Sequence, residues 1–458
     1  MSPRELVSRE GEVAVIGLAR SGRAAALLLK KHGFNVYASD VTSSPDTGRT
    51  AEELRARGII VDVGRHDLER LERASLVVAS PGVPPSARPL AFAREKGVRI
   101  ASEVEVALHF LDSSRIIAIT GTNGKTTTTA LIAHLLRGLD LEAVEAGNIG
   151  TPLSEIASRE LQPKWISLEM SSFQLHDTPS LKPDVGILTN LSPDHLDRYA
   201  TVEEYYSDKA RLFANADANS VWVVNEDDKG VMLMVRDVAG HKYGFSIVGE
   251  ASAYIDDRSG ELVVLGTPLL ARKDLPLLGQ HNVGNALAAS LAVMAGDRSH
   301  QTQKARKGIA AALKTFRSLP HRLELVGEFA GVQWINDSKA TNVSSTAVAI
   351  DGMERPTVLL LGGRHKGEAY TPLAEAVKRK VKRVIAYGEA APLIATDLRP
   401  VVDVVRLGSD FEEVMRVAKA AARAGEAVLL SPACSSYDMF SNYEERGERF
   451  RALAAKEA

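Results

Sequence analysis

Short apolar runs alternate with longer stretches of helical pattern along the whole chain, in three successive blocks. In the first block, residues 1–112, the strand-like runs are Val13–Gly17, Asn35–Ser39 and Leu76–Ser80, and Arg23–His32 has the pattern of a helix. Strands that alternate with helices in this way predict a parallel, doubly wound α/β sheet.

The same alternation continues through residues 113–318 and 319–458. The second block begins with Ile116–Thr120, an apolar run too short for a helix, and the third follows Ser318–Pro320, where a proline and a change of pattern indicate a boundary. The remaining strand-like runs are Trp165–Leu168, Val185–Leu188, Val221–Val224, Val332–Ile335, Thr357–Leu361, Val384–Tyr387 and Val428–Leu430. We therefore expect three α/β domains in series, with a binding site in the clefts between them.

Composition and charge narrow the choice of partners only slightly. The chain carries 56 basic and 58 acidic residues, a net charge of -2, which gives no general attraction to nucleic acid or to an anionic membrane. A single cysteine, Cys434, excludes an intramolecular disulfide and fits a reducing compartment. We see no apolar signal region and no uncharged apolar run long enough to span a bilayer, so we expect a cytoplasmic protein without membrane insertion.

The strongest chemical signal is a glycine-rich turn near the start of the second block. Thr120–Thr127 reads TGTNGKTT and opens the helical run Thr128–Arg137. Glycines let backbone N–H groups point at phosphate oxygens, and the helix N-terminus adds partial positive charge. Lys125 would contact the outer phosphates and the Thr126 hydroxyl would bind Mg²⁺. Ile119 replaces the first glycine of the usual eight-residue pattern, so this is a shortened variant; the alternative is a glycine turn capped by threonines. We expect ATP binding.

Polar side chains follow two further strands of the second block. Glu169 comes directly after Trp165–Leu168, at the end of the strand where a parallel sheet presents its ligands. The segment Asn190–Asp197 brings two carboxylates beside His195, which makes this histidine a candidate ligand or substrate contact. Taken alone, Glu169 and Lys209 would each be expected as solvated surface side chains.

The first block has a glycine-rich turn of its own. Gly17–Gly22 reads GLARSG between a strand and a helical stretch, and Asp40 ends the next strand, as in a dinucleotide-binding fold. Ala19 stands where a second glycine would let the backbone approach a pyrophosphate, so NAD binding is disfavoured and close packing is the other explanation. A dehydrogenase would also need a hydride-transfer site, and the later blocks carry ATP machinery instead.

Seven segments, in the same order, resemble the Mur ligase family. They are GTNGKTT, LEMSSFQL, TNLSPDHLDRY, GQHNVGNA, LPHRLE, WINDSKATN and SPACSSYDMF. The resemblance covers the whole chain, and LEMSSFQL, WINDSKATN and SPACSS are most similar to the members that add D-glutamate. The phosphate loop alone is shared more widely, including with folylpolyglutamate synthetases. The resemblance implies a three-domain α/β fold: a Rossmann-like domain for the UDP part of the substrate (1–112), a central P-loop ATPase domain with a mainly parallel sheet (113–318), and a Rossmann-like amino-acid domain (319–458).

The resemblance also implies residues for ATP and for two Mg²⁺ ions. Lys209 matches the lysine that the family carries as a carbamate, which converts a cation into an oxygen ligand. The implied metal ligands are Thr126, Glu169, His195 and Lys209 as carbamate, and the implied catalytic residues are Lys125, Glu169, His195 and Lys209. The implied nucleotide-binding residues are Gly121, Thr122, Asn123, Gly124, Lys125, Thr126, Thr127, Asn282, Asn285, Arg322 and Asp337.

Two further sets of residues are implied for the other substrates. UDP-N-acetylmuramoyl-L-alanine would contact Arg20, Ser21, Gly22, Asp40, Thr42, Gly82, Asn148 and Ser171. The incoming D-glutamate would contact Lys339, Thr341, Lys366, Ser436, Tyr437 and Tyr443. This sequence departs from the family pattern at two places in the second set: Arg-His is inserted before Lys366, and Tyr443 stands where a phenylalanine would be unsurprising.

Together these matches imply an ATP-dependent ligase of peptidoglycan precursor biosynthesis. It would join the L-alanyl carboxylate of the UDP-linked precursor to the amine of D-glutamate through an acyl phosphate, as a monomer and without nucleic acid. A sister ligase for another amino acid is the nearest alternative. The chain lacks the Asp-Asn-Pro-Arg segment of the diaminopimelate- or lysine-adding enzymes and the Gly-Thr-His-Gly-Lys of the alanine-adding ones. An ATP-binding switch without chemistry is the alternative from another class.

Two features of the third block are expected to be structural. Cys434 is expected as a small buried side chain near the amino-acid pocket. The stretch Arg446–Lys456 carries mixed charges in a helical pattern and is expected to be a solvated helix face.

Overall fold

The computed structural model describes residues 11–194 and 198–456, which form two compact units. The first unit comprises the chain up to Arg272 together with Gly284–Lys314. The second comprises Lys273–Val283 and the chain from Thr315 onward. No helix in the described part of the chain is long and apolar enough to cross a membrane.

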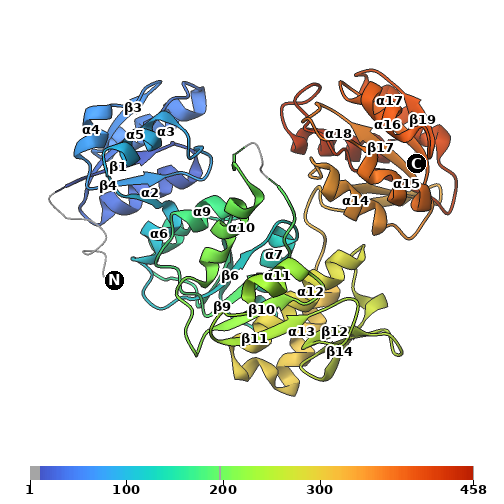
Figure 1. Ribbon diagram of the computed structural model, residues 1–458, viewed down its shortest axis with the longest axis horizontal. Coiled ribbons are helices and arrows are strands. Elements are labelled where there is room, and N and C mark those ends of the chain that lie inside the picture. Colours follow the sequence, from blue (N-terminus) through green and yellow to red (C-terminus); the bar gives the residue numbers. More distant parts are fainter. Residues whose placement is uncertain (1–10, 195–197, 457–458) are drawn as a thin grey trace. The chain divides into compact units, whose positions relative to one another are not determined.

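The first unit begins with a parallel sheet of strand order β3-β2-β1-β4-β5, and α2 packs against β1 and β4 (Figure 1). Its central strand, β1, is buried from Val13 to Ile16, as expected for a strand covered on both faces. The strands are β1 (Glu12–Ile16), β2 (Asn35–Asp40), β3 (Ile60–Val63), β4 (Leu76–Ala79) and β5 (Ile100–Ser102). The helices are α2 (Arg20–Lys31), α3 (Pro45–Ala56), α4 (Leu68–Arg73) and α5 (Arg88–Glu95).

A second sheet in the same unit has the order β14-β13-β12-β11-β10-β9-β6-β8-β7. It is parallel from β7 to β12, and two antiparallel hairpins, β12-β13 and β13-β14, extend its edge. The strands are β6 (Arg115–Thr120), β7 (Ala143–Gly147), β8 (Trp165–Glu169), β9 (Val185–Leu188), β10 (Val221–Asn225), β11 (His241–Phe245), β12 (Ala253–Asp256), β13 (Glu261–Val264) and β14 (Thr267–Ala271).

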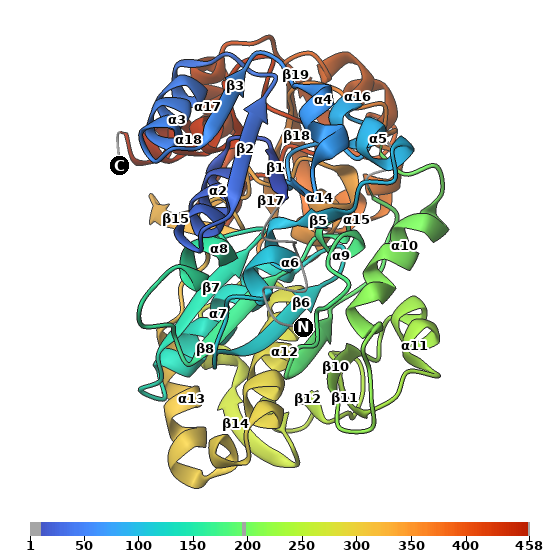
Figure 2. The ribbon, with the colours of Figure 1, turned by 90° about the vertical axis from the view of Figure 1, so that its left-hand side faces the viewer.

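The helices around this second sheet include α7, which packs on β7 and β8 (Figure 2). They are α6 (Glu103–Leu108), α7 (Lys125–Arg137), α8 (Leu153–Ala157), α9 (Ser172–His176), α10 (Val202–Ala210), α11 (Lys229–Val235), α12 (Gln280–Gly296) and α13 (Gln303–Thr315). Short 3₁₀ turns are η1 (Arg211–Phe213), η2 (Arg272–Asp274) and η3 (Arg298–Gln301). Because β6 lies between β9 and β8, the loops that follow these three strands meet at one edge of the sheet, where open α/β sheets bind ligands.

The second unit holds a third sheet of order β15-β16-β20-β17-β18-β19, parallel except for β15. Alternate residues of β17 enter two separate cores: Leu359 and Leu361 on one face, Val358 and Leu360 on the other. The strands are β15 (Glu324–Phe329), β16 (Val332–Asn336), β17 (Thr357–Gly362), β18 (Val381–Tyr387), β19 (Asp403–Arg406) and β20 (Ala427–Leu430). The helices are α14 (Val343–Asp351), η4 (Thr371–Leu373), α15 (Ala374–Lys380), α16 (Ala391–Leu398), α17 (Phe411–Ala421) and α18 (Tyr443–Ala455).

These sheets confirm the predicted α/β class with mostly parallel strands. Each strand-like run of the sequence coincides with a strand. Residues 273–283 belong to the second compact unit, although they lie inside the predicted central block. The domain boundaries at 112/113 and 318/319 therefore stay predictions.

Within the first unit, Glu103 joins α6 to α8. Its side chain is 1% exposed, and Oε1 accepts a hydrogen bond of 2.5 Å from the backbone N–H of Ser154. Oε2 is buried without a hydrogen-bond partner in the described structure. Burial raises the pKa of this carboxyl to about 7, against the opposing effect of the bonds from Ser154.

We expect the Glu103→Gln variant to gain thermal stability relative to the wild type as the pH rises. The pKa of Glu103 in the folded protein lies above the ordinary value of 4.5. The protonated carboxyl therefore contributes stability in full below pH 4.5, and this contribution is lost as the pH rises through about 7. A rise in pKa of this size corresponds to a loss of about 3 kcal/mol from the free energy of unfolding, since one pKa unit is about 1.4 kcal/mol. Glutamine keeps the acceptor for Ser154 and does not titrate.

Melting temperatures measured at about pH 5.5 and about pH 8.5 test this expectation. The difference between variant and wild type should grow toward high pH, whereas the exposed Glu142→Gln control should show the same small difference at both. A constant difference for Glu103→Gln would contradict the raised pKa.

Candidate active site

The glycine-rich loop after β6 adopts a backbone that only glycine permits at two positions. Gly121 has a φ of +143° and Gly124, the N-cap of α7, has a φ of +83°. A Cβ atom on Gly121 would clash with the Thr189 hydroxyl, and one on Gly124 would clash with the Asn285 carboxamide. The loop therefore presents bare backbone in front of the N-terminus of a thirteen-residue helix, the arrangement that binds phosphate.

The segment that follows β9 holds this loop in place. The Asn123 N–H donates to Asn190 Oδ1 at 2.8 Å, and the Thr122 N–H donates to the Asn190 carbonyl oxygen at 3.0 Å. In return, Thr189 Oγ1 donates to the Asn123 carbonyl oxygen at 2.7 Å. Because β9 is the parallel neighbour of β6, its carboxyl end necessarily lies beside the loop. Thr189 and Asn190 were not among the predicted site residues, although the segment TNLSPDHLDRY contains both.

Lys125 starts α7 and turns back over the loop. Its Nζ donates to the carbonyl oxygens of Gly121 at 2.9 Å and Thr122 at 2.7 Å. Thr126 is half-buried and Thr127 is buried in the same first turn. The loop thus combines one cationic side chain with the N–H groups of a helix start, both suited to anionic oxygens.

Glu169, at the end of β8, is buried beside the end of β6, the strand that leads into the loop. It is 1% exposed, and its Oε1 accepts a hydrogen bond of 2.8 Å from Asn148 Nδ2. Its Oε2 is buried and has no hydrogen-bond partner among the described residues. Such an oxygen calls for a ligand, because an unsatisfied buried carboxylate oxygen is costly. The expectation of a solvated glutamate, taken from the residue alone, is wrong.

Lys209, on α10, is also buried, at 1% exposure. Its Nζ donates to the Gly121 carbonyl oxygen at 2.7 Å and lies 4.4 Å from the ring centroid of Tyr205. Burial, followed by the charge of Lys125, lowers the pKa of this amine well below its usual value. The expectation of a solvated helix lysine is therefore wrong as well.

These residues fit a magnesium site in composition. No cluster of three or more His, Cys, Asp or Glu side chains occurs in the part of the chain that the structure describes. The implied set is of a different kind: the Thr126 hydroxyl, the open Glu169 oxygen and Lys209, with His195 lying outside the described residues. Oxygen donors are what Mg²⁺ prefers, and Lys209 would join them only as a carbamate.

The predicted precursor contacts are distributed over the first sheet and the loops after β7 and β8. Asp40 accepts backbone bonds of 2.8 Å from Leu18 and from Thr42, which joins the GLARSG turn to the segment after β2. Arg20 donates to the Gly150 carbonyl oxygen at 3.0 Å. Ser21 is half-buried, Gly22 is buried against the Gly17 carbonyl, Thr42, Gly82 and Asn148 are exposed, and Ser171 caps α9. The Arg20 contact brings the turn of the first sheet to the loop that carries Asn148.

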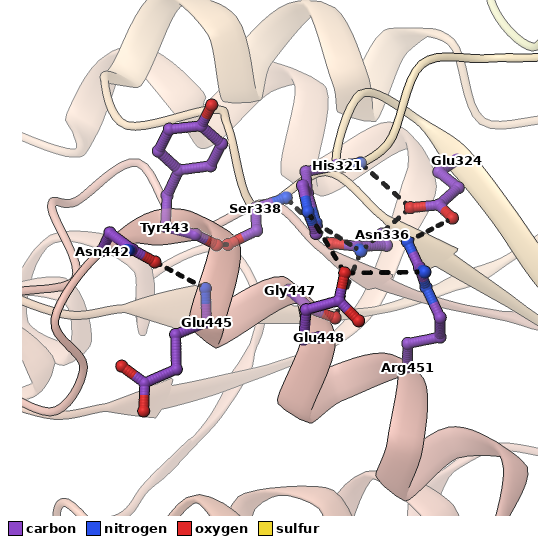
Figure 3. Close-up of polar contacts among 10 residues, drawn as sticks. All are labelled: His321, Glu324, Asn336, Ser338, Asn442, Tyr443, Glu445, Gly447, Glu448 and Arg451. Atoms are coloured by element: carbon purple, nitrogen blue, oxygen red, sulfur yellow. Dashed lines mark hydrogen bonds and ion pairs between the residues drawn. The ribbon is translucent and has the colours of Figure 1, made fainter.

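In the second unit, a polar network fixes the segment around Arg322 (Figure 3). His321 has a φ of +64°, and its ring Nδ1 lies 3.0 Å from Asn336 Nδ2, while the ring packs so closely on Gly447 that a Cβ there would clash. Glu324 Oε2 accepts from the His321 N–H at 2.9 Å, and Glu324 Oε1 accepts from Arg451 at 2.8 Å. Strand β15, the end of β16 and helix α18 are thereby tied together.

Asp337 lies directly after β16 and is almost fully buried. Its Oδ1 accepts from the Leu323 N–H at 3.1 Å, and its Oδ2 accepts from Ser431 Oγ at 2.8 Å. Burial raises its pKa to about 7, against the effects of these bonds and of Arg322. Of the two predicted asparagines, Asn285 accepts at 3.2 Å from Thr128 Oγ1 of α7, just after the phosphate loop, whereas Asn282 belongs to the second unit and donates to the Leu278 carbonyl oxygen at 2.7 Å.

The predicted amino-acid contacts gather on the loops after three neighbouring strands of the third sheet and at the start of α18. Lys339 and Thr341 follow β16, Lys366 follows β17, Ser436 and Tyr437 follow β20, and Tyr443 is the first residue of α18. Lys339 Nζ lies 3.8 Å from the ring centroid of Tyr443, a cation–π contact. Ser436 is buried, Tyr437 and Lys366 are exposed, and Lys339, Thr341 and Tyr443 are half-buried.

Two expectations for this region have different outcomes. Cys434 is buried as expected, its thiol lies 2.9 Å from the Tyr370 hydroxyl, and burial raises its pKa to about 11. Arg446 was expected on a solvated face and is fully buried, so that expectation is wrong. Phe450, Leu453 and Ala454 mark the buried side of α18, and Arg446 precedes Phe450 by one helical turn, a spacing that could have placed it there.

Three domain models of known proteins match the chain along most of its length. They are the Mur ligase MurD-like N-terminal domain over residues 11–102, the Mur ligase middle domain over 119–293, and the Mur ligase glutamate ligase domain over 321–434. Several relatives, at 36–39% identity, bear the name UDP-N-acetylmuramoylalanine--D-glutamate ligase. The one from Desulfatibacillum aliphaticivorans is 39% identical over 443 residues, covering 96% of this chain and 97% of the relative. The one from Cytophaga hutchinsonii is 38% identical over 451 residues, covering 96% and 98%.

The chain belongs to the Mur ligase family. Solved structures agree with its fold. The MurF ligase from Thermotoga maritima in complex with ADP has a TM-score of 0.62 at 18% identity and covers 93% of this Mur ligase and 96% of its own chain. The UDP-N-acetylmuramate-alanine ligase MurC from the same organism has a TM-score of 0.61 at 18% identity, covering 97% and 100%. Likeness at these identities confirms the predicted three-domain α/β fold.

We expect the Gly124→Ala variant of this Mur ligase to bind ADP at least about tenfold more weakly than the wild type, because alanine is strained at this positive φ and its Cβ would displace Asn285. Isothermal titration calorimetry measures the effect. Gly284→Ala is the matched control, since its Cβ would meet only ordinary contacts, 3.7 Å from Ile247 and Phe245. Equal ADP affinity in the two variants would contradict the phosphate role of the loop.

Proposed function

We propose that this chain is the ATP-dependent ligase that joins the L-alanyl carboxylate of UDP-N-acetylmuramoyl-L-alanine to the amine of D-glutamate, in the synthesis of the peptidoglycan precursor. The observation that carries the proposal is the convergence of Glu169 and Lys209, both buried, on one glycine-rich phosphate loop. The relatives that bear the name of this activity, at 36–39% identity over nearly the whole chain, support the same reaction.

The reaction needs an activated carboxylate, because an oxide ion is too poor a leaving group. In the proposed first step, an alanyl carboxylate oxygen attacks the γ-phosphorus of ATP and the bond to the β-phosphate oxygen breaks, which gives an acyl phosphate and ADP. In the second step, the D-glutamate amine attacks the acyl carbon and loses a proton, and the tetrahedral intermediate expels inorganic phosphate. Both steps concentrate negative charge, so electrostatic stabilisation is the main contribution that the protein makes.

The phosphate loop would meet this charge with Lys125 and with the N–H groups at the start of α7. Two Mg²⁺ ions, when bound, would neutralise phosphate charge and align the reacting oxygens. Thr126, the open oxygen of Glu169, His195 and a carbamate on Lys209 would hold them. Support for the carbamate comes from the position of Lys209: a buried lysine beside Lys125 is poorly placed as a second ammonium ion, and a carbamate would reverse its charge.

The other substrates are assigned to the outer blocks. Residues 1–112 would bind the UDP part of the precursor through the GLARSG turn and Asp40, and Asn148 and Ser171 of the central block, 113–318, would contact its muramoyl part. Arg322 and Asp337 of the block 319–458 would contact ATP, together with Asn282 and Asn285 of the central block. Lys339 and Lys366 would bind the D-glutamate carboxylates as point charges. We propose that the enzyme acts in the cytoplasm, as a monomer.

We expect the purified protein to release phosphate from ATP only when Mg²⁺, UDP-N-acetylmuramoyl-L-alanine and D-glutamate are all present. A coupled phosphate assay with each amino acid in turn tests this expectation. Release that depends on L-glutamate or diaminopimelate would move the chain to a sister ligase. Binding of ATP without any release would favour a nucleotide-binding switch.

We expect Lys209→Ala to lose about 10²–10³-fold in turnover, the usual cost of removing one preorganised electrostatic group. Short carboxylates such as formate or acetate should restore part of the activity, because they can replace the carbamate oxygens in the space that the side chain vacates. Methylamine should not. Rescue by methylamine and not by carboxylates would show that Lys209 acts as a cation, and would overturn the carbamate.

A further inference from the structure

Arg446 is the one charged side chain in the described part of the chain with no exposed surface and three hydrogen bonds to loop atoms. Its exposed fraction is 0%. Nε donates to Ser338 Oγ at 2.9 Å, Nη2 donates to the Ser338 carbonyl oxygen at 2.8 Å, and Nη1 donates to the Cys434 carbonyl oxygen at 3.1 Å. The guanidinium therefore bridges the loop after β16 and the loop after β20.

No carboxylate of the described residues forms an ion pair with this guanidinium. Asp438, on the loop after β20, accepts from the Glu389 N–H at 3.1 Å through Oδ2, and its Oδ1 is buried without a hydrogen-bond partner among the described residues. Its charge acts on Tyr387 and Cys434, as that of Arg446 does. Tyr387, at the end of β18, is a neutral neighbour, since burial raises the pKa of its hydroxyl. A buried cation without a counter-ion is strongly disfavoured unless dipoles or a ligand compensate it. Carbonyl and hydroxyl oxygens compensate Arg446 in part, and its net positive charge remains.

The loops that meet at Arg446 are those that carry the assigned amino-acid contacts. Strands β16, β20 and β17 are neighbours in the sheet. A Cβ on Gly363, just after β17, would lie 3.2 Å from Arg446 Nη1, so this third loop also packs against the guanidinium. Lys339 follows Ser338 directly, Ser436 lies two residues after Cys434, and Lys366 lies three residues after Gly363.

Ser338 extends the effect of Arg446 to the aromatic wall. Its hydroxyl accepts from Arg446 Nε and donates at 2.8 Å to the carbonyl oxygen of Tyr443, which starts the helix that carries Arg446. The Tyr443 ring in turn lies under Lys339 Nζ. One guanidinium thus fixes the positions of Lys339 and the Tyr443 ring relative to the loop after β20, which carries Ser436.

We propose that Arg446 is the positioning residue that sets the affinity of the site for a dicarboxylic amino acid. It holds three loops at a fixed spacing, and its charge, which no carboxylate of the described chain pairs with, adds to that of Lys339 and Lys366 behind the two carboxylates of the substrate. The proposal rests on the proposed function in one respect, the identity of the amino acid as D-glutamate. Arginine is required because its planar fork can reach two loops at once, which an ammonium group cannot.

The test separates geometry from charge with two substitutions. Arg446→Lys keeps the charge and loses the fork, and we expect it to raise the KM for D-glutamate by about tenfold. Arg446→Met loses both, and we expect a rise of about a hundredfold, with the KM for ATP within about twofold of the wild type. Arg449→Met is the matched control: this arginine lies on the same helix, pairs with Glu412 at the surface, and should leave both constants unchanged.

A second readout keeps the proposal distinct from a loss of fold. With ATP, Mg²⁺ and precursor but no D-glutamate, the first turnover forms ADP, and the amplitude of this burst should be the same in wild type and Arg446 variants. No burst in the wild type would overturn the proposed function. A normal wild-type burst that falls in the variants in step with turnover would overturn the positioning role.

If the Arg446 variants do not fold, Ser338→Ala carries the test. It removes the hydroxyl that links Arg446 Nε to Tyr443 and leaves the guanidinium in place. We expect the KM for D-glutamate to rise about threefold to tenfold, with an unchanged burst. An unchanged KM in this variant would overturn the proposal.

Discussion

The hydrogen bond from the Lys209 amine to the Gly121 carbonyl oxygen is the contact on which the site of the first unit depends. It joins α10 to a loop 88 residues earlier in the chain, and it brings a second lysine beside Lys125. Two adjacent ammonium ions, one buried and one half-buried, repel each other, so the environment favours a neutral or a modified amine at Lys209. The same loop is locked on its other side by Thr189 and Asn190: the Asn123 N–H donates to Asn190 Oδ1, and Thr189 Oγ1 donates to the Asn123 carbonyl oxygen, so a phosphate would be met by the N-terminus of α7.

Most of the fold could be predicted from the sequence, because the strands of a parallel sheet are short apolar runs with clear breaks between them. The antiparallel extension β12–β14 was not predicted. Its strands are short and partly exposed, and the alternation of β14 is weak, so local pattern does not distinguish them from loop. Register and neighbour order were also beyond the sequence, since they depend on contacts between residues far apart in the chain.

The candidate site could be predicted only where a residue type is required by its backbone. Gly121 and Gly124 are such positions, and their pattern is visible in the sequence. The burial of Glu169, Lys209 and Arg446 is not visible in the sequence, because charged residues are usually solvated. Only the packing of remote segments reveals the exceptions. Resemblance to the family compensated for this at Glu169, which lies in the segment LEMSSFQL, and at Lys209, which it matched as a single residue. It gave no indication for Arg446, which lies just after the quoted segments.

Asn148 shows how the buried carboxylate and the precursor site are connected. Its N–H and its Nδ2 both donate to Glu169, at 3.0 Å to the carbonyl oxygen and at 2.8 Å to Oε1. One carboxylate oxygen thereby accepts from the protein, and Oε2 is the oxygen without a hydrogen-bond partner among the described residues. The loop that carries Asn148 also offers the Gly150 carbonyl oxygen to Arg20 of the first sheet. A precursor that contacts Arg20 and Asn148 would therefore contact the same loop that orients Glu169. Its alanyl carboxylate would then lie at the edge of the sheet that carries the phosphate loop.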